Sequence, residues 1–254
     1  MIVRCDDIVK TFPVNRGAKG VVKAVDGVSL SIDKGQAYGL VGESGSGKTT
    51  IGKIVLGILK PDSGTVSVGT KKVQVVFQDP FNSLDPKMRV WDILAEGLIL
   101  SKSLSKSDFL RKPDFDRRIA SILDLVRLPK SALKKYPHQF SGGERQRIAI
   151  GRAVLTDPEF IVCDEPVSSL DVTIQLQVLR LRKDIQQKFG MTYLFISHDL
   201  RVVRFMCSKV AIMKEGRIVE EGDVRQIYSD PSNAYTRQLL NSIPHIVSEQ
   251  KSNK

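Results

Sequence analysis

The sequence predicts an α/β protein in which short apolar strands alternate with amphipathic helices around one glycine-rich loop. Three neighbouring observations indicate this class. Residues Gln36–Val41 are mostly apolar and predict a short strand, and Gly42–Thr50 read Gly-Glu-Ser-Gly-Ser-Gly-Lys-Thr-Thr. A helix is expected over residues 50–59, since four apolar residues recur there on one face at helical spacing: Ile51, Ile54, Val55 and Ile58.

The loop matches the phosphate-loop pattern G-x-x-x-x-G-K-[ST] at every fixed position from Gly42 to Thr49. Its glycines allow the backbone to curl around a triphosphate, and the following helix adds its positive N-terminal end. Lys48 would reach the β and γ phosphates, and the Thr49 hydroxyl would bind Mg²⁺. A Gly/Ser-rich turn followed by a chance Lys-Thr is the alternative, but the flanking strand and helix favour a nucleoside triphosphate site. The loop residues expected to contact it are Gly42, Glu43, Ser44, Gly45, Ser46, Gly47, Lys48, Thr49 and Thr50.

Length and composition are those of an ordinary globular protein. The chain has 254 residues, of which 41% are hydrophobic and 26% charged, enough for one large domain or a core with a subdomain. Apolar runs stay well below the roughly 20 residues of a membrane helix, and the first residues lack the pattern of a secretory signal. Cys5, Cys163 and Cys207 have no metal-ligand spacing and are expected to be reduced; Cys163 and Cys207 are expected in the core.

The formal net charge of +11 arises from 39 basic and 28 acidic residues. A nucleic-acid partner, attraction of ATP, an anionic membrane face and an ordinary solvated surface all remain compatible with it. The sequence contains no recognisable recognition helix or aromatic–basic platform for single strands. Charge alone therefore does not assign a partner.

The N-terminal part predicts strands at Ile2–Lys10 and Lys23–Ile32, joined by a Gly/Lys-rich loop at Asn15–Gly20. Phe12, at the start of that loop, either stacks on a purine ring or covers the sheet edge. Further strands are expected at Thr65–Val68 and Val73–Phe77. Gln78 follows the latter at the strand end where ligands collect in α/β sheets, which favours a role beyond that of a surface residue.

The pattern from residue 87 to 155 is mainly helical, with helices expected at Val90–Leu100 and Phe115–Val126. A further helix is expected after Ser141, because Ser141 and Glu144 form a capping-box pattern. That pattern is either only a good cap, or a helix N-terminus that Gly142 and Gly143 leave open to a phosphate.

Two more strands are expected to end in reactive side chains. Phe160–Asp164 is apolar and ends in Asp164 and Glu165, whose charges are costly to bury unless a cation or water meets them. Mg²⁺ on Asp164 and a water near Glu165 would satisfy both. His198 follows the strand Met191–Ser197; it is either a capping residue or, at the same sheet edge, a contact for the γ-phosphate.

The rest of the chain predicts helices at Val172–Phe189, Leu200–Met206 and Asn233–Ile243, with a hairpin between Val210 and Glu220. The chain is expected to be one domain with three parts. They are an α/β core with an antiparallel β-subdomain (1–86 and 156–222), a helical subdomain (87–155) and a C-terminal helical tail (223–254).

Together these segments resemble the ATP-binding subunits of ATP-binding cassette (ABC) transporters, over nearly the whole chain. Gly42–Thr49 is similar to the Walker A loop and Phe160–Asp164 to the Walker B strand of a P-loop NTPase core with a RecA-like fold. The resemblance implies roles for other positions: Glu165 as catalytic glutamate, Gln78 as the Q-loop glutamine, Asp171 as the end of the D-loop, His198 as switch histidine, Phe12 as the adenine-stacking aromatic, and Ser141, Gly142, Gly143 and Glu144 as the signature, which usually ends in Gln.

What the resemblance implies is an ATPase that uses ATP and Mg²⁺, with Thr49, Gln78 and Asp164 around the metal. Glu165, His198 and Lys48 would act on the γ-phosphate. Two cassettes would enclose two ATP molecules, so that the Ser141 signature serves the partner's nucleotide. Closure on ATP would then drive a membrane permease through the helical subdomain near Gln78–Trp91.

Within the family, the chain is most similar to the oligopeptide, dipeptide and nickel importer group, in Val75–Pro86, Cys163–Val172 and Ala234–Pro244. Its partners would be a second ATPase subunit, usually a similar but different chain, two integral membrane permease subunits and, indirectly, an extracellular binding protein. It would lie at the cytoplasmic face of the cell membrane. No nucleic acid is expected. The main alternative function is that of a soluble ABC ATPase acting on nucleic acid or ribosomes. A second alternative is a phosphate-loop kinase, which would leave Ser141–Glu144 and Asp171 without a role.

Overall fold

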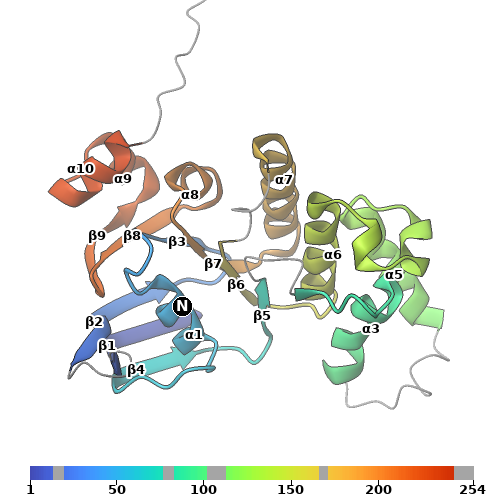
Figure 1. Cartoon of the computed structure of the whole chain (residues 1–254), viewed down its shortest axis with the longest axis horizontal. Coiled ribbons are helices and arrows are strands. Elements are labelled where there is room, and N and C mark those ends of the chain that lie inside the picture. The colour runs from blue at the N-terminus through green and yellow to red at the C-terminus, as the bar shows by residue number, and fades with distance from the viewer. Residues whose placement is uncertain (14–19, 77–82, 102–112, 166–170, 243–254) are drawn as a thin grey trace, which may run out of the picture.

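The computed structural model describes residues 1–13, 20–76, 83–101, 113–165 and 171–242. Within this part of the chain there are two sheets; the helix Lys48–Val55 lies between them, and further helices cover the other face of the larger sheet (Figure 1). The α/β class with a mixed sheet and N-terminal antiparallel strands, predicted from the sequence, is therefore confirmed. The expected hairpin and long helices also form, and all three cysteines are buried and unpaired.

The larger sheet has six strands in the order β5-β6-β7-β3-β8-β9. Its strands β5 to β8 pair in parallel, and β9 pairs antiparallel to β8. A second sheet of order β2-β1-β4 is antiparallel. The strands are β1 (Val3–Pro13), β2 (Val21–Ile32), β3 (Ala37–Val41), β4 (Ser63–Val68), β5 (Val73–Val76), β6 (Phe160–Asp164), β7 (Thr192–Ser197), β8 (Lys209–Lys214) and β9 (Arg217–Asp223).

Helices cover both faces of the larger sheet. Within the described ranges, the α-helices are α1 (Lys48–Val55), α3 (Val90–Ser101), α5 (Pro113–Leu125), α6 (Gly142–Val154), α7 (Val172–Phe189), α8 (Leu200–Met206), α9 (Val224–Ser229) and α10 (Ala234–Asn241). Two short 3₁₀ helices, Lys130–Lys134 and Pro137–Gln139, precede α6. Figure 1 shows α3, α5 and α6 grouped at one end of the molecule, away from α1.

The core has two parts because each strand of the larger sheet sends alternate side chains to opposite faces. In β3, Tyr38 and Leu40 pack with Ile51 and Ile54 of α1 between the two sheets. Ala37 and Val41 belong to the second part, which lies under α7 and α8 and continues into α3, α5 and α6.

Helix α1 is shorter than the sequence predicted. It ends at Val55, and Ile58, expected on its buried face, is 62% exposed. Gly57 adopts a left-handed φ of 72°, its N–H bonds Ile54 O at 2.9 Å, and Ile58 N–H bonds Lys53 O at 2.9 Å. These two bonds form a Schellman cap, which turns the chain away before another helical turn can form.

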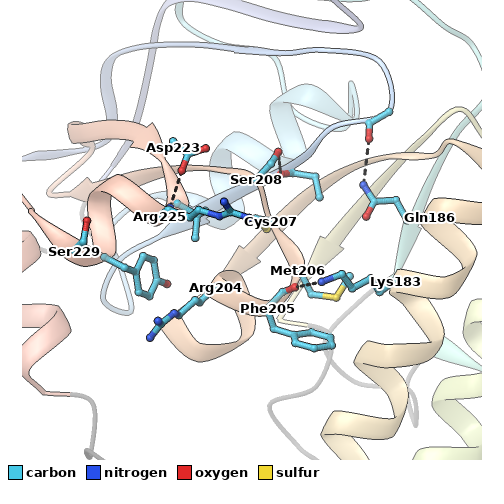
Figure 2. A pocket seen from close by; sticks show the side chains of 14 residues that line it. Lys183, Gln186, Arg204, Phe205, Met206, Cys207, Ser208, Asp223, Arg225 and Ser229 are labelled. Atoms are coloured by element: carbon cyan, nitrogen blue, oxygen red, sulfur yellow. Dashed lines mark hydrogen bonds between the residues drawn. The ribbon is translucent and has the colours of Figure 1, made fainter.

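The C-terminal part contains a helix that the sequence analysis missed. Asp223 accepts a 2.7 Å hydrogen bond from Arg225 N–H and begins α9, which buries Val224 and Ile227. The last helix spans Ala234–Asn241; the expected end at residue 243 lies outside the described residues, which end at Ser242. A pocket of about 800 Å³ lies beside α8 and α9, near the first residues of β3 and β8 (Figure 2).

Candidate nucleotide site

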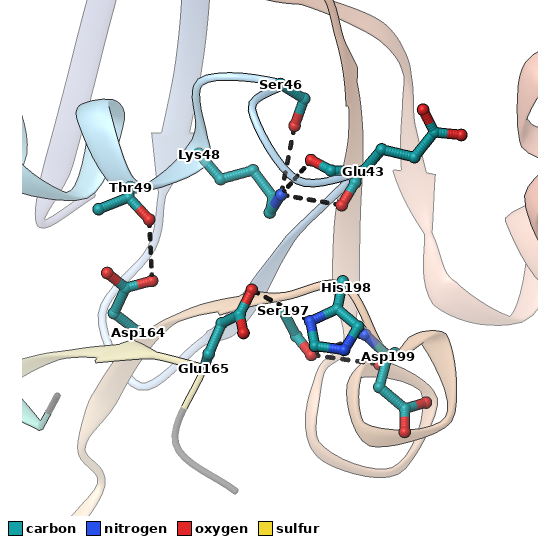
Figure 3. A network of polar contacts seen from close by, with 10 residues as sticks. Glu43, Ser46, Lys48, Thr49, Asp164, Glu165, Ser197, His198 and Asp199 are labelled. Atoms are coloured by element: carbon teal, nitrogen blue, oxygen red, sulfur yellow. Dashed lines mark hydrogen bonds and ion pairs between the residues drawn. The ribbon is translucent and has the colours of Figure 1, made fainter. Parts of the chain in front are cut away.

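Three neighbouring strands bring the candidate site together. Strands β6, β7 and β3 are adjacent and parallel, with Asp164 opposite Ile196 and Val41 opposite Ser197. Their C-terminal ends therefore meet at one edge of the sheet. Asp164–Glu165, His198 and the loop after Val41 lie together at this edge, as the sequence predicted (Figure 3).

Two glycines of the loop are required by close backbone approaches. Gly47 has a φ of 103°, and a Cβ there would lie 2.0 Å from Ala24 O of β2. A Cβ on Gly42 would lie 2.1 Å from Met213 O of β8. The loop is further held by a 3.1 Å hydrogen bond from Gly216 N–H to Ser46 O. Backbone groups of both sheets therefore fix the conformation of the loop in the protein without nucleotide.

Lys48 extends back along the loop. Its Nζ lies 2.8 Å from Gly42 O, 2.7 Å from Glu43 O and 3.3 Å from Ser46 Oγ, which matches the three donors of an ammonium group (Figure 3). Burial lowers the pKa of Lys48, and the nearby carboxylates Glu165, Asp164 and Glu43 oppose that shift. Lys48 is therefore a buried cation that a phosphate oxygen could reach by replacing one of the loop acceptors.

Thr49 and Asp164 form an oxygen pair across the site. Thr49 Oγ1 donates a 3.2 Å hydrogen bond to Asp164 Oδ1. Burial raises the pKa of Asp164 and the charge of Glu165 adds to the rise, whereas Thr49 and Lys48 oppose it. Hydroxyl and carboxylate oxygens are the ligands that Mg²⁺ prefers when nucleotide phosphates supply the others. No group of three or more His, Cys, Asp or Glu suited to a metal occurs in the described ranges, so Mg²⁺ here would depend on the phosphates.

Glu165 and His198 contact each other at the edge of the candidate site. His198 Nδ1 lies 3.0 Å from Glu165 Oε1, and the Glu165 side chain is only 20% exposed. The φ of Glu165 is 45°, uncommon outside glycine, and its N–H bonds Ile196 O at 2.9 Å. Such strained backbone is often kept at functional sites, since it aims a side chain where regular strand geometry would not.

The N-terminus of α1 is left uncapped by side chains. Its N-cap is Gly47, whereas α6 to α10 are each capped by the side chain of a Ser, Asp or Asn. The first N–H groups of α1 therefore point into the loop with no side-chain acceptor, the arrangement that binds phosphate at helix N-termini. Together with Lys48, Thr49 and Asp164, it fits a Mg²⁺-bound nucleotide.

The raised pKa of Asp164 predicts a stability gain on neutralising it. Because the pKa in the folded protein exceeds the ordinary value of 3.8, ionised Asp164 destabilises the nucleotide-free fold, and stability is lost as pH rises through that pKa. We expect Asp164→Asn to melt at a higher temperature than the parent at neutral pH. The difference should vanish below pH 3.8. Melting temperatures across pH, without nucleotide or Mg²⁺, measure this.

Asp62 provides a control of opposite sign. Hydrogen bonds from Lys10 and Thr11 lower the pKa of Asp62 to about 2, so its stabilisation is present above pH 3.8 and is lost as pH falls to about 2. Asp62→Asn should therefore lower the melting temperature at neutral pH. If both variants shift it in the same direction, the assigned environment of Asp164 is wrong.

The residues of the signature lie on another part of the molecule. Ser141 caps α6: its Oγ accepts a 3.3 Å bond from Glu144 N–H, and its backbone N–H donates a 2.9 Å bond to Glu144 Oε2, which completes the predicted capping box. The Ser141 hydroxyl donates a further 2.9 Å bond to the same oxygen. Helix α6 packs against α3, α5, α7 and β5, whereas α1 packs between the two sheets. The structure therefore does not bring Ser141–Glu144 to the loop of the same chain (Figure 1).

Gly143 has a packing role that the sequence analysis did not foresee. A Cβ at this position would lie 2.4 Å from Ile174 Cγ2 on α7. We expect Gly143→Ala to destabilise the protein by about 1–3 kcal/mol through overpacking, both with and without bound nucleotide. Thermal melting without nucleotide measures the loss. In an Ile174→Ala background the added cost should largely disappear, and an unchanged cost there would refute the steric explanation.

The other predicted positions are more dispersed. Ser46 is buried, whereas Glu43, Ser44 and Gly45 are exposed at the tip of the loop and Thr50 is half-buried. Phe12 pairs with Val22 across β1 and β2, is 39% exposed, and leaves both of its expected roles open. Asp171 caps α7, accepting a 3.0 Å bond from Ile174 N–H. Gln78 and residues 168–170 of the D-loop lie outside the described residues.

Two contacts near the site were not anticipated. Tyr235 of α10 accepts a 3.4 Å hydrogen bond through its hydroxyl from Glu43 N–H, joining the C-terminal part to the loop. Asp199 caps α8 directly after His198 by accepting a 2.8 Å bond from Arg201 N–H. The sequence signals the cap, because an Asp before an apolar run marks a helix start. It contains no local signal for the Tyr235 contact, which joins residues 192 positions apart.

Comparisons with known proteins agree with this geometry. The model of a family described as "ABC transporter" matches residues 25–168, more than half of the chain. The chain belongs to the ABC transporter family. Of its curated relatives, the oligopeptide transport ATP-binding protein OppF of Lactococcus lactis subsp. lactis is 46% identical over 96% of this chain and 81% of its own length. A putative peptide import ATP-binding protein of Brucella abortus is 44% identical over 96% of this chain and 77% of its own length.

Solved structures of the family share the fold. An ATP-binding cassette of an ABC transporter, solved in its ADP conformation, has a TM-score of 0.76 at 27% identity, covering 95% of this chain and 98% of its own. ATP and Mg²⁺ are thus the cofactors of this ABC ATPase. In the described ranges, the helices are all too short or too polar to cross a bilayer.

Proposed function

We propose that this chain is the ATP-hydrolysing subunit that energises a peptide importer. The observation that carries the proposal is the single edge at which Lys48, Thr49, Asp164, Glu165 and His198 converge. The choice of peptides over nickel complexes as cargo is supported by relatives that are named for peptide transport or import. Their sequences are more than 40% identical to this one over nearly the whole chain.

Binding of the triphosphate would begin with exchange of hydrogen bonds at Lys48. Its ammonium already holds three loop oxygens, and phosphate oxygens are stronger acceptors because they are charged. The N–H groups at the start of α1 would bind the same phosphates. Thr49 and Asp164 would hold Mg²⁺, which supplies Lewis-acid stabilisation of the charge on the transferred phosphoryl group.

Glu165 would orient and deprotonate the attacking water. A general base must lie within hydrogen-bond reach of the water and be held in place, and the 3.0 Å contact with His198 provides the second condition. His198 is 54% exposed, so its outer edge remains accessible to a γ-phosphate. We infer that His198 aligns Glu165 and detects the γ-phosphate, while Lys48 stabilises the negative charge.

Completion of the site would require a second cassette. The signature residues Ser141 and Gly143 lie on α6, away from the loop of their own chain, and would bind the nucleotide of a partner. Homologous cassettes that are not identical, or two copies of this chain, both fit that arrangement. Phe12 would stack on the adenine, and Gln78 and Asp171 would connect the site to Mg²⁺ and to the partner.

The helical segment 87–155 would pass the motion to the membrane. We infer that it forms a subdomain apart from the α/β core (1–86 and 156–222) and the tail (223–254), and that it contacts two integral membrane permease subunits. The chain would then lie peripherally on the cytoplasmic face of the cell membrane, with an extracellular binding protein delivering peptide to the permease.

Isolation from native membranes tests this proposal. A tagged chain should be recovered with integral membrane subunits and a second ATP-binding subunit. ATP hydrolysis by that complex in liposomes should rise on addition of peptide-loaded binding protein and stay at the basal level with unloaded protein. Recovery with ribosomes or nucleic acid, and no membrane subunit, would overturn it.

A further inference from the structure

The pocket beside α8 and α9 lies at the other edge of the sheet from the nucleotide site. It is lined by Gly35 and Ala37 before and at the start of β3, and by Ser208 before β8. The phosphate loop leaves the other end of β3, about 17 Å away along a five-residue strand. The volume of about 800 Å³ falls within the range of small-molecule sites, and the residues assigned to ATP take no part in its lining.

Three helices each contribute one cation to the lining of this pocket. Lys183 comes from α7, Arg204 from α8 and Arg225 from α9 (Figure 2). Asp223 is the carboxylate of the lining, and its Oδ1 already accepts the 2.7 Å bond from Arg225 N–H that caps α9. The lining therefore has an excess of positive charge, with three cations against one carboxylate.

Among the described residues, the pocket cations differ from their neighbours in having no ion-pair partner. Just outside the lining, Lys209 pairs with Glu221 at 2.6 Å and Arg201 pairs with Asp199 at 2.8 Å. In the described ranges, by contrast, no carboxylate lies within ion-pair distance of Arg204 or Arg225. Lys183 donates instead to a neutral acceptor, Phe205 O, at 3.0 Å. The positive charges of Arg204, Arg225 and Lys183 are thus not neutralised by a carboxylate in the described part of the chain.

Aromatic rings hold two of the cations in place. The ammonium of Lys183 lies 4.6 Å from the centre of the Phe205 ring, and the guanidinium of Arg204 lies 5.7 Å from that of Tyr228. These contacts reduce the freedom that a long side chain loses when it binds an anion. None of the exposed large apolar side chains of the described residues lines the pocket, which argues against contact with a bilayer.

We propose that this pocket binds a small soluble organic anion that carries phosphate, independently of ATP at the phosphate loop. Two guanidinium groups present forked N–H donors whose geometry matches phosphate oxygens, and Lys183 adds a point charge. A ligand with at least two negative charges balances the net charge of the lining. The basic residues of this lining also account for part of the net charge of +11, which the nucleotide site alone does not explain.

Methionine methyl groups allow binding at the two sites to be followed separately by NMR. Met206 lines the pocket, and Met213 lies beside the phosphate loop, with its Cε 2.7 Å from the Cβ position of Gly47. The protein, labelled with ¹³C at its five methionine methyls, would be saturated with a non-hydrolysable ATP analogue and Mg²⁺ and titrated with pyrophosphate. We expect a saturable shift of Met206 below about 10 mM pyrophosphate, with Met213 unmoved.

Variants test whether the lining residues bind the probe. Arg204→Gln combined with Arg225→Gln should weaken pyrophosphate binding at least about tenfold at unchanged melting temperature. Arg180→Gln combined with Lys188→Gln removes the same charge from α7 outside the lining and should leave the affinity unchanged. Equal weakening by both pairs, or a Met206 signal that never shifts, would overturn the proposal. Failure of the nucleotide site would appear separately, as a Met213 signal that does not respond to the ATP analogue.

Discussion

Replacing Glu165 by glutamine is expected to slow ATP hydrolysis at least about a hundredfold while ATP still binds, because a positioned general base contributes about 10²–10⁴ in rate. The amide keeps the size of the side chain and can still accept the 3.0 Å contact from His198, but it cannot take a proton from water. Phosphate release under saturating ATP gives the rate, and a nucleotide titration gives the affinity. The variant should also accumulate as a closed dimer with ATP.

Glu159→Gln is the matched control for this experiment. Glu159 precedes the opposite end of the same strand, β6, and faces Lys34 and Lys72 on the surface. The same change there should leave turnover within about twofold of the parent, since exposed ion pairs contribute little. Unchanged turnover in Glu165→Gln would show that another group activates the water.

Lys48→Ala is expected to weaken ATP binding at least about a hundredfold, since each hydrogen bond to a charged group is worth about 1.5–3 kcal/mol and the ammonium would make two to the phosphates. The effect should appear in affinity, because Lys48 contacts the phosphates before any bond breaks. Titration with a fluorescent ATP analogue measures it directly.

Two comparisons separate this loss from general damage to the loop. Lys53→Ala removes an exposed cation from the same helix and should keep the parental affinity. Lys48 also binds Gly42 O and Glu43 O, so a melting curve must show that Lys48→Ala is folded at the assay temperature. A folded Lys48→Ala protein with parental affinity would refute the assigned binding mode.

The sequence predicted where most residues of the candidate site lie, because each belongs to a short local pattern. The phosphate loop, the acids after β6 and the histidine after β7 are each short patterns at a strand end. Parallel pairing of β6, β7 and β3 then brings these ends together. Gly57 after α1 was a visible capping signal, which the apolar periodicity of residues 50–59 outweighed in the prediction. Asp223 before α9 was a helix-start signal that the sequence analysis did not use.

Other features depend on contacts that no local pattern records. Gly143 is matched to Ile174 on the next helix, so its role in packing is visible only in three dimensions. The contact of Tyr235 with Glu43 joins segments far apart in the chain, and the pocket lining brings in Lys183, Arg204 and Arg225 from three different helices. Such pairs are specified by tertiary packing, which propensity and spacing in one sequence do not determine.

The central claim is that a second cassette completes the ATP site through Ser141, and Ser141→Asp tests it most directly. Aspartate is as good an N-cap as serine, but it cannot donate the hydrogen bond that the Ser141 hydroxyl gives to Glu144 Oε2, so a melting curve must show that the variant is folded at the assay temperature. Its carboxylate would repel the partner's γ-phosphate. The measurement is ATP turnover by the assembled transporter carrying this variant. We predict a loss of at least about a hundredfold, with unchanged ATP affinity of the isolated chain. Full turnover by Ser141→Asp, or by a chain that sedimentation shows to stay monomeric, would contradict the account.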